Sequence, residues 1–411
     1  MRRRCSRLWR SWWRADSAKA PKPTPPGAVE TAPRRPGPDQ LLTFPRSVRA
    51  RPREPERKPP GLTEGHLFRK QKSIVGLDLG SQVLKAVEIT MQGDEAVLTG
   101  FARVEVPAGA DRNAALSQLL AEGKFASRNA VVSVAGQSVV VRYISMLEMS
   151  DSELRQAIHY ELDKYLPFDK DDVVMDCQRL KRRPPSRGEG PGAGQISVVL
   201  AACQKSALHS TLKDVQSKGL TPVAVDLDAF ALGNAWEMSA LALGQATDRP
   251  IALVDVGSSR TQINVLAQGE TCFSREIGLG GADMTQAIAR RLGMELAEAE
   301  ALKRNPGERA FEVARAIVSV LEDMVSEIGL SLEFVENREE LAVEEVLVSG
   351  SALLAPGAVE FLAQSTGRTV RPWNPLSGVR IQDGRIPAEE LDLIGPSLAV
   401  AIGLASRVRA A

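Results

Sequence analysis

The sequence predicts an α/β protein with two related domains, each built on a mixed sheet flanked by helices. Its 411 residues exceed one ordinary domain, and 43% of them are apolar, enough for two packed cores. Strand-sized apolar runs alternate with helical patterns along the chain. An apolar run that ends in Asp-x-Gly-Ser and continues as an alternating strand occurs at 73–90 and again at 251–270. This recurrence indicates an internal repeat of about one domain.

The first 65 residues differ in composition from the rest. They hold 16 Lys and Arg against 6 Asp and Glu, and 12 of the 25 prolines. Such a segment cannot bury enough apolar surface to offset its ordering entropy, so we expect a disordered basic tail. Its start, RRRCSRLWRSWWR, would place Leu8, Trp9, Trp12 and Trp13 on one helical face beside arginines, which suits an anionic membrane surface. The alternative is a mis-annotated start, with the folded chain beginning near His66.

Composition also argues against several classes of protein. The apolar runs are strand-sized, far below the ~20 residues that span a bilayer, and no secretory signal is present. Cys5, Cys177, Cys203 and Cys272 form neither a CxxC pair nor a disulfide framework. Nucleic-acid binding has only the basic tail in its favour. We therefore expect a cytoplasmic protein that has no transmembrane segment and binds no nucleic acid.

After the basic tail, glycine turns separate strand-like runs in the first half of the remaining chain. Strands at 73–79, 83–90 and 96–106 read as an antiparallel meander, and 130–146 reads as a second hairpin. The capping-box spacing of Ser150 and Glu153 begins a helix over 151–165, which Pro167 ends. Residues 181–194 are predicted to be an exposed loop. A strand at 196–203, a helix at 204–218 and a strand at 222–230 follow.

After a connector at 239–249, the second half repeats the opening pattern. The strands of 251–270 precede helices at 283–303 and 308–337, and 344–367 reads as a strand, a Gly350-Ser351 turn and a helix. An Ala-rich helix ends the chain. We expect domain I at 66–240, domain II at 250–390, and a C-terminal segment, 391–411, that returns to domain I.

The two Asp-x-Gly-Ser turns have the chemistry to hold a magnesium-bound phosphate. Asp78 and Asp255 can meet the cation, usually through water. The glycines let the backbone amides approach the phosphate, and the serine hydroxyls add donors. Lys85 offers a point charge. Each turn alone is better explained as ordinary hairpin chemistry, but two at domain spacing can clamp a polyphosphate from both sides.

The three turns resemble the phosphate-1, phosphate-2 and adenosine motifs of the actin, sugar-kinase and heat-shock-chaperone superfamily. Five blocks narrow the resemblance: SIVGLDLGSQVLKAVEI, AIHYELDKYLPFDKDDVVMDC, VDVGSSRTQINVLAQGE, SREIGLGGADMTQAIARRLGMELAEAEALKR and GPSLAVAIGLASR. Together they resemble the PilM family, the actin-like assembly proteins of type IV pili, from about residue 68 to the C-terminus. The resemblance implies an actin-like ATPase fold with nucleotide in the cleft and a small inserted, FtsA-like subdomain at about 93–149.

The resemblance also implies a set of ATP- and Mg²⁺-binding residues. Facing the phosphates from domain I would be Asp78, Gly80, Ser81 and Lys85. Facing them from domain II would be Asp255, Gly257, Ser258 and Ser259. Near the ribose and base would lie Gly280, Gly281, Glu300 and Lys303, with Gly350 and Ser351 closing over the adenosine. Glu300 and Lys303 could equally be an ordinary ion pair on a helix surface.

Two features weaken the case for tight binding and turnover. Gln82 and Val83 stand where the family usually has further hydroxyls, and a hydrogen bond to a charged phosphate is worth roughly 1.5–3 kcal/mol. Hydrolysis needs a polar group that aligns a water, and Glu161 is the candidate because it interrupts the apolar stripe of its helix. The alternative is a carboxylate paired with Lys164. At most a slow ATPase is expected.

By resemblance, the protein is an ATP-binding scaffold of type IV pilus assembly. It would capture the cytoplasmic N-terminal peptide of PilN in a groove between domain I and the inserted subdomain, and would thereby be recruited to the inner membrane and its other assembly proteins. The resemblance leaves a homo-oligomer open. One rival is an FtsA-like, membrane-tethered filament protein, although the end GLASRVRAA has no amphipathic anchor. Another is a small-molecule kinase, for which Asp226, Asp228 and Asp283 offer no convincing base.

Overall fold

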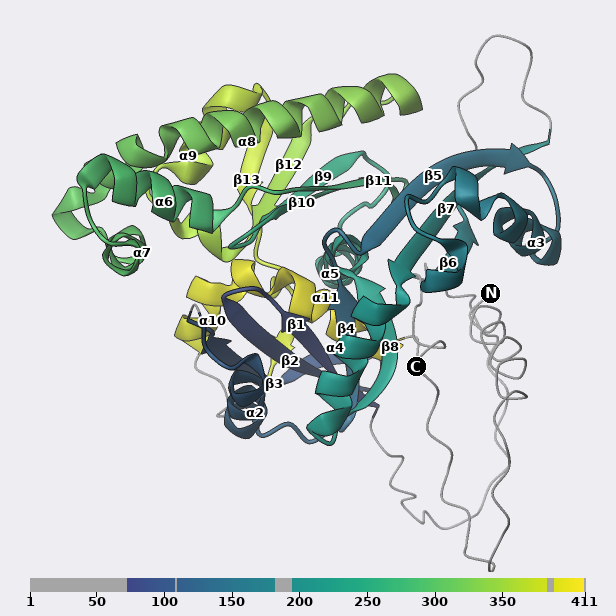
Figure 1. The fold of residues 1–411 in the computed structure, drawn as a ribbon, viewed down its shortest axis with the longest axis horizontal. Helices are drawn as coiled ribbons and strands as arrows, with labels where there is room; N and C mark the ends of the chain where they lie inside the picture. The colour runs from purple at the N-terminus through teal and green to yellow at the C-terminus, as the bar shows by residue number, and fades with distance from the viewer. Residues whose placement is uncertain (1–71, 108, 182–193, 383–387, 410–411) are drawn as a thin grey trace, which may run out of the picture.

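The repeat seen in the sequence folds into two mixed sheets that face each other across a pair of helices (Figure 1). The structure, a computed structural model, describes residues 72–107, 109–181, 194–382 and 388–409. The predicted basic tail, and most of the predicted loop at 181–194, lie outside the described residues. The actin-like α/β fold class expected from the sequence is confirmed.

Domain I is built on a six-stranded sheet in the order β14-β3-β2-β1-β4-β8. Strands β1 and β2 and strands β2 and β3 pair antiparallel, whereas β1, β4 and β8 run parallel. Helices α2 and α4 pack against this sheet. The bounds are β1 (Ser73–Leu79), β2 (Val83–Gln92), β3 (Glu95–Glu105), α2 (Arg112–Gly123), β4 (Asn129–Val134), α4 (Lys205–Ser217), β8 (Thr221–Leu227) and β14 (Arg380–Ile381).

Domain II repeats the arrangement with a five-stranded sheet in the order β11-β10-β9-β12-β13. The helix expected at 283–303 is two helices, because the left-handed Gly293 ends the first of them. The 30-residue α8 lies along the sheet with its apolar stripe inward. The bounds are β9 (Ile251–Val256), β10 (Thr261–Ala267), β11 (Glu270–Ile277), α6 (Gly281–Leu292), α7 (Leu296–Arg304), α8 (Ala310–Glu339), β12 (Glu345–Ser349), α9 (Ala358–Thr366) and β13 (Thr369–Pro372).

The small subdomain is a separate three-stranded sheet, β5-β7-β6, covered by one helix. Its elements are β5 (Val139–Leu147), α3 (Asp151–Glu161), β6 (Val173–Arg179) and β7 (Gln195–Gln204). The expected range of about 93–149 is therefore wrong, because β3 and β4 belong to the large sheet. The hairpin expected at 130–146 is wrong for the same reason, since β4 pairs with β1 and β8, while β5 pairs with β7.

Two helices lie between the large sheets and join the domains. Helix α5 (Asp228–Ala242) is apolar on all sides and buried along most of its length, as expected of a core helix. Beside it lies α11 (Ala399–Ala405), which follows α10 (Ala388–Ile394) and packs on β1. Among the described residues, the stretch Leu391–Arg409 is long and apolar enough to span a membrane, but 67% of it is buried in the protein. Here it is a core element.

Candidate functional site

The first glycine turn joins β1 to β2 at the inner end of domain I. The strand register sets Asp78 opposite Lys85, and the Lys85 ammonium donates to Asp78 Oδ2 at 2.8 Å. A side chain at Gly80 would bring a Cβ within 2.5 Å of the Val83 carbonyl oxygen. The tight turn therefore requires glycine, and it leaves a carboxylate and an ammonium side by side at the strand ends.

The second turn joins β9 to β10 with the same geometry. Asp255 pairs in register with Gln262, and the amide of Gly257 donates to the Arg260 carbonyl at 2.9 Å to close the turn. One oxygen of Asp255 accepts a hydrogen bond of 2.7 Å from the hydroxyl of Ser349, the last residue of β12. The two Asp-x-Gly-Ser turns are thus equivalent in structure as well as in sequence.

The charges of the two turns are strongly coupled. Burial alone would lower the pKa of Lys85, but the carboxylates of Asp78, Asp255 and Asp228 outweigh burial and raise it. Burial raises the pKa of Asp255 to about 6, against the lowering effects of Lys85 and the Ser349 hydrogen bond. Three carboxylates therefore surround one ammonium, an arrangement that attracts further positive charge, such as a divalent cation.

Turns from both domains line one cavity of about 280 Å³. Its lining includes nine of the predicted binding residues: Asp78, Gly80, Ser81, Lys85, Asp255, Gly257, Ser258, Ser259 and Ser351. The volume and the polar lining suit a polar ligand held between two domains. The cavity wall does not include the other five predicted binding residues, Gly280, Gly281, Glu300, Lys303 and Gly350.

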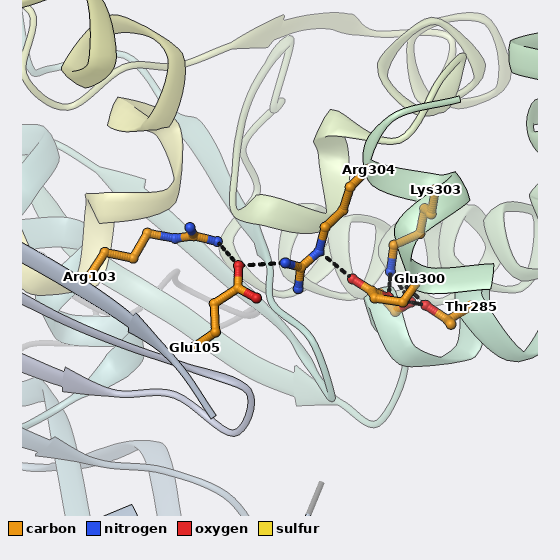
Figure 2. A network of polar contacts seen from close by, with 7 residues as sticks. Arg103, Glu105, Thr285, Glu300, Lys303 and Arg304 are labelled. Atoms are coloured by element: carbon orange, nitrogen blue, oxygen red, sulfur yellow. Dashed lines mark hydrogen bonds and ion pairs between the residues drawn. The ribbon is translucent and has the colours of Figure 1, made fainter. Parts of the chain in front are cut away.

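Three of those five belong to a network behind the second turn (Figure 2). The amide of Gly281 donates to the Gly257 carbonyl at 2.9 Å, which fixes the start of α6 against the turn. The buried Lys303 ammonium donates to the Gly281 carbonyl, to Thr285 Oγ1 and to Glu300 Oε2, each at 2.7 Å. Glu300 and Lys303 are thus a hydrogen-bonded pair tied to the turn, not the isolated surface pair considered above.

The same network crosses from domain II to domain I. Arg304 donates through Nε to Glu300 at 2.8 Å and pairs through Nη1 with Glu105, at the end of β3. Arg103 reaches the same Glu105 oxygen at 3.2 Å (Figure 2). Glu105 and Arg304 therefore connect the two domains beside the proposed nucleoside residues.

The third turn, after β12, also depends on glycine. Gly350 has φ of 101°, and a Cβ there would lie 2.3 Å from the Val256 carbonyl oxygen. Its amide donates to the Pro396 carbonyl at 3.0 Å, which ties the turn to the C-terminal segment. Ser351, the next residue, lines the cavity, and only a glycine before it allows this close approach.

Glu161 does not fit the catalytic role expected of it. It ends α3 in the small subdomain and is not part of the cavity lining. Lys164 contacts it at 3.1 Å and the Tyr165 hydroxyl donates to it at 3.1 Å, and these bonds lower the pKa of Glu161. The alternative, a carboxylate paired with Lys164, is what the structure contains.

Asp228, which the sequence analysis considered only as the base of a kinase and rejected, is a third carboxylate of the site. It is the first residue of α5, directly after β8, and it lines the cavity. Burial, reinforced by the Asp78 carboxylate, raises the pKa of Asp228 to about 7. Because β1, β4 and β8 are parallel, their carboxyl ends share one edge of the sheet. Recognising that pairing in the sequence would have placed Asp228 beside Asp78.

The carboxylates of the cavity fit a magnesium ion only together with a ligand. Among the described residues, no three His, Cys, Asp or Glu side chains are grouped so that they could hold a metal by themselves. Mg²⁺ is usually held by one or two carboxylates, water and substrate phosphates. Asp78 and Asp255 satisfy that requirement from opposite domains.

Comparison with known proteins gives one family and several relatives. Residues 76–409 match the family model described as type IV pilus assembly protein PilM. The cell division protein FtsA of Bacillus subtilis (strain 168) is 29% identical over 120 residues, 29% of this chain and 26% of that protein. EutJ of Escherichia coli (strain K12), an ethanolamine utilization protein, is 22% identical over 138 residues, 31% of this chain and 46% of that protein. These matches span less than half of each curated relative.

A solved structure matches nearly the whole described body. The PilM-PilN type IV pilus biogenesis complex contains a chain that is 29% identical and superposes with a TM-score of 0.70. The match covers 82% of this chain and 98% of that one.

Proposed function

This chain belongs to the type IV pilus assembly protein PilM family, and from that premise we propose that it is an ATP-binding scaffold of pilus assembly. The proposal has two parts, a nucleotide held between the domains and a short peptide of PilN held by the small subdomain. One observation supports it above all: two Asp-x-Gly-Ser turns, one from each domain, face a single cavity.

ATP suits the cavity because both turns offer donors and charge to a polyphosphate. Lys85 supplies a charged ammonium, while Ser81 and Ser258 supply hydroxyls. Ser258 Oγ is buried and has no hydrogen-bond partner among the described residues, and such a buried donor is costly unless a ligand satisfies it. Lys303 and Glu300, which lie outside the cavity lining, would hold the start of α6 and the second turn in place, and Ser351 would lie beside the adenosine.

Magnesium would be held by Asp78 and Asp255 through water and would neutralise phosphate charge when bound.

For hydrolysis, Asp228 replaces Glu161 as the residue that orients the attacking water, since it lines the cavity and its pKa is about 7. A group that titrates near the working pH can accept a proton from water. Asp228→Asn should therefore abolish slow phosphate release from Mg-ATP without reducing Mg-ATP binding. Weaker binding by this variant would instead indicate that Asp228 is a ligand-binding group.

The partner is proposed to be the cytoplasmic N-terminal peptide of PilN, because the similar solved structure is a PilM-PilN complex. The small subdomain, residues 139–204, borders domain I and supplies an edge strand, β5, and the helix α3. A peptide in the groove between the subdomain and domain I would bring this chain to the inner membrane and its assembly proteins. The protein would then act in the cytoplasm, peripheral to that membrane.

A synthetic PilN N-terminal peptide should bind the protein, and Mg-ATP should strengthen that binding by favouring one conformation of the cleft. Fluorescence anisotropy of a labelled peptide, with and without Mg-ATP, measures both effects. A peptide of the same composition in scrambled order is the control. Absence of binding in both conditions would refute the scaffold proposal, while nucleotide binding could still stand.

The contact between Glu105 and Arg304 should slow the release of nucleotide. Both side chains are nearly half exposed, at 46% and 41%, and such a pair is worth about 0.2–1 kcal/mol. Glu105→Lys should therefore speed release of a fluorescent ATP analogue by up to about fivefold, measured by stopped flow. The matched control is Glu312→Lys, which breaks a similarly exposed pair with Arg309 within domain II. Equal rates in wild type and Glu105→Lys would contradict a role in release.

A further inference from the structure

Arg112, which lies outside the β1-β2 hairpin, hydrogen-bonds to the backbone of the first glycine turn. It is the first residue of α2, and its guanidinium donates to the carbonyls of Leu79 at 2.7 Å and Gly80 at 2.9 Å, with a weaker contact to Ser81 at 3.4 Å. Arg112 also lines the cavity. One side chain therefore connects a distant helix to three successive carbonyls of the turn.

The hydrogen bonds from Arg112 also determine which way the backbone amides of the first turn face. In a trans peptide the carbonyl and the following N–H point in opposite directions. Carbonyls of residues 79, 80 and 81 that face Arg112 therefore leave the amides of Gly80, Ser81 and Gln82 facing the other way. The guanidinium both fixes that orientation and offsets the negative ends of three dipoles, which would otherwise repel an anion at the cavity edge.

Arg112 differs from the other positively charged residues of the cavity lining in the groups to which it is bonded. The lining contains Asp78, Asp214, Asp228 and Asp255, together with Lys85 and Arg260. Lys85 is paired with Asp78 at 2.8 Å, and Arg260 lies 3.4 Å from the carboxylate of Glu276. The hydrogen bonds of Arg112 described above go instead to uncharged carbonyls, which leaves its positive charge able to attract an anion in the cavity.

We propose that Arg112 is a positioning residue for polyphosphate: it holds the first turn in its anion-binding form and adds a positive charge at the β- and γ-phosphates. This inference rests on the proposed function, because it assumes that the ligand carries phosphates.

The test is calorimetric titration of the full chain with Mg-ATP, Mg-ADP and AMP, in wild type, Arg112→Ala and Arg112→Lys. Arg112→Ala should weaken Mg-ATP and Mg-ADP by about 10- to 100-fold, the range for hydrogen bonds that involve a charged group, and weaken AMP much less. Arg112→Lys should be intermediate, because an ammonium keeps the charge but lacks the planar fork.

The matched control is Arg290→Ala, which removes another exposed arginine that donates to a backbone carbonyl, that of Gln286, outside the cavity lining. It should bind all three ligands as wild type does. Wild-type Mg-ATP affinity in Arg112→Ala, alongside lost binding in Asp78→Ala, would overturn this inference alone. An equal loss for ATP and AMP would overturn the phosphate-positioning role. No Mg-ATP binding by the wild type would overturn the proposed nucleotide function and this inference with it.

Discussion

Mg-ATP binding should fall by about 10- to 100-fold when either Asp78 or Asp255 is changed to alanine, because each change removes one carboxylate that holds the phosphate-bound metal. The two residues come from different domains but line the same cavity. A clamp of this kind needs both sides, so loss from one variant alone would contradict it. Calorimetric titration with Mg-ATP gives the affinities directly.

Removing the metal should abolish or reverse the loss of ATP affinity in Asp78→Ala and Asp255→Ala. Without Mg²⁺, the carboxylates of the cavity face phosphate oxygens of the same charge, and like charges close together repel. Titration with ATP in excess EDTA should therefore show that Asp78→Ala and Asp255→Ala bind no worse than wild type. Variants that bind weakly with and without Mg²⁺ would indicate a damaged site instead of a lost metal contact.

The fold should tolerate these two substitutions. Asp78, Asp228 and Asp255 share one ammonium, Lys85, so deleting one carboxylate relieves repulsion and still leaves Lys85 two acidic neighbours. Urea midpoints close to wild type are expected. The control is Asp163→Ala, an exposed carboxylate 3.8 Å from Lys170 in the small subdomain, which should change neither stability nor nucleotide binding.

The resemblance of five sequence blocks predicted the family and the actin-like fold correctly, and local sequence patterns predicted the hairpins that carry both Asp-x-Gly-Ser turns. Those features depend on neighbouring residues: an apolar strand, a glycine where the backbone folds back, and a strand that returns in register. Ser258 and Lys85 need only their own hairpins to reach the cavity. Their geometry is therefore visible in a short stretch of sequence.

Features that depend on distant pairing were missed. Residues 130–146 contain two good strands and a Gly136 turn, yet β4 and β5 separate into different sheets because each has a better partner far away in sequence. Asp228 and Arg112 reach the cavity only through the parallel β1-β4-β8 order and the packing of α2 on β3. Local periodicity carries no information about those choices.

Asp226→Leu is expected to cause a large loss of stability. The Asp226 carboxylate is fully buried and accepts hydrogen bonds from Arg407 Nε at 2.8 Å, from Asn234 at 3.1 Å and from the Leu227 amide at 2.9 Å. Removing one partner of a buried ion pair leaves the other uncompensated, which costs about 3–5 kcal/mol. That is a large share of the roughly 5–15 kcal/mol that stabilises a typical domain, and urea unfolding would measure it.

A double variant separates the ion pair from the packing around it. Asp226→Leu combined with Arg407→Leu removes both charges, and apolar replacements of buried pairs are often neutral or stabilising. The double variant should therefore be more stable than Asp226→Leu alone. A loss equal to the sum of the two single losses would mean that the two side chains act independently and that the pair is not what holds the C-terminal segment.

The pair also bears on the nucleotide site, because Asp226 lies two residues before Asp228 at the end of β8. Arg407 comes from the segment that follows α11, which packs on β1, the strand that carries Asp78. Anchoring that segment to β8 therefore holds the ends of both strands at the cavity. Mg-ATP affinity should fall in Asp226→Leu and recover in the double variant together with stability. Recovery of stability without recovery of affinity would show that the charges themselves, and not the position of the strand ends, matter at the site.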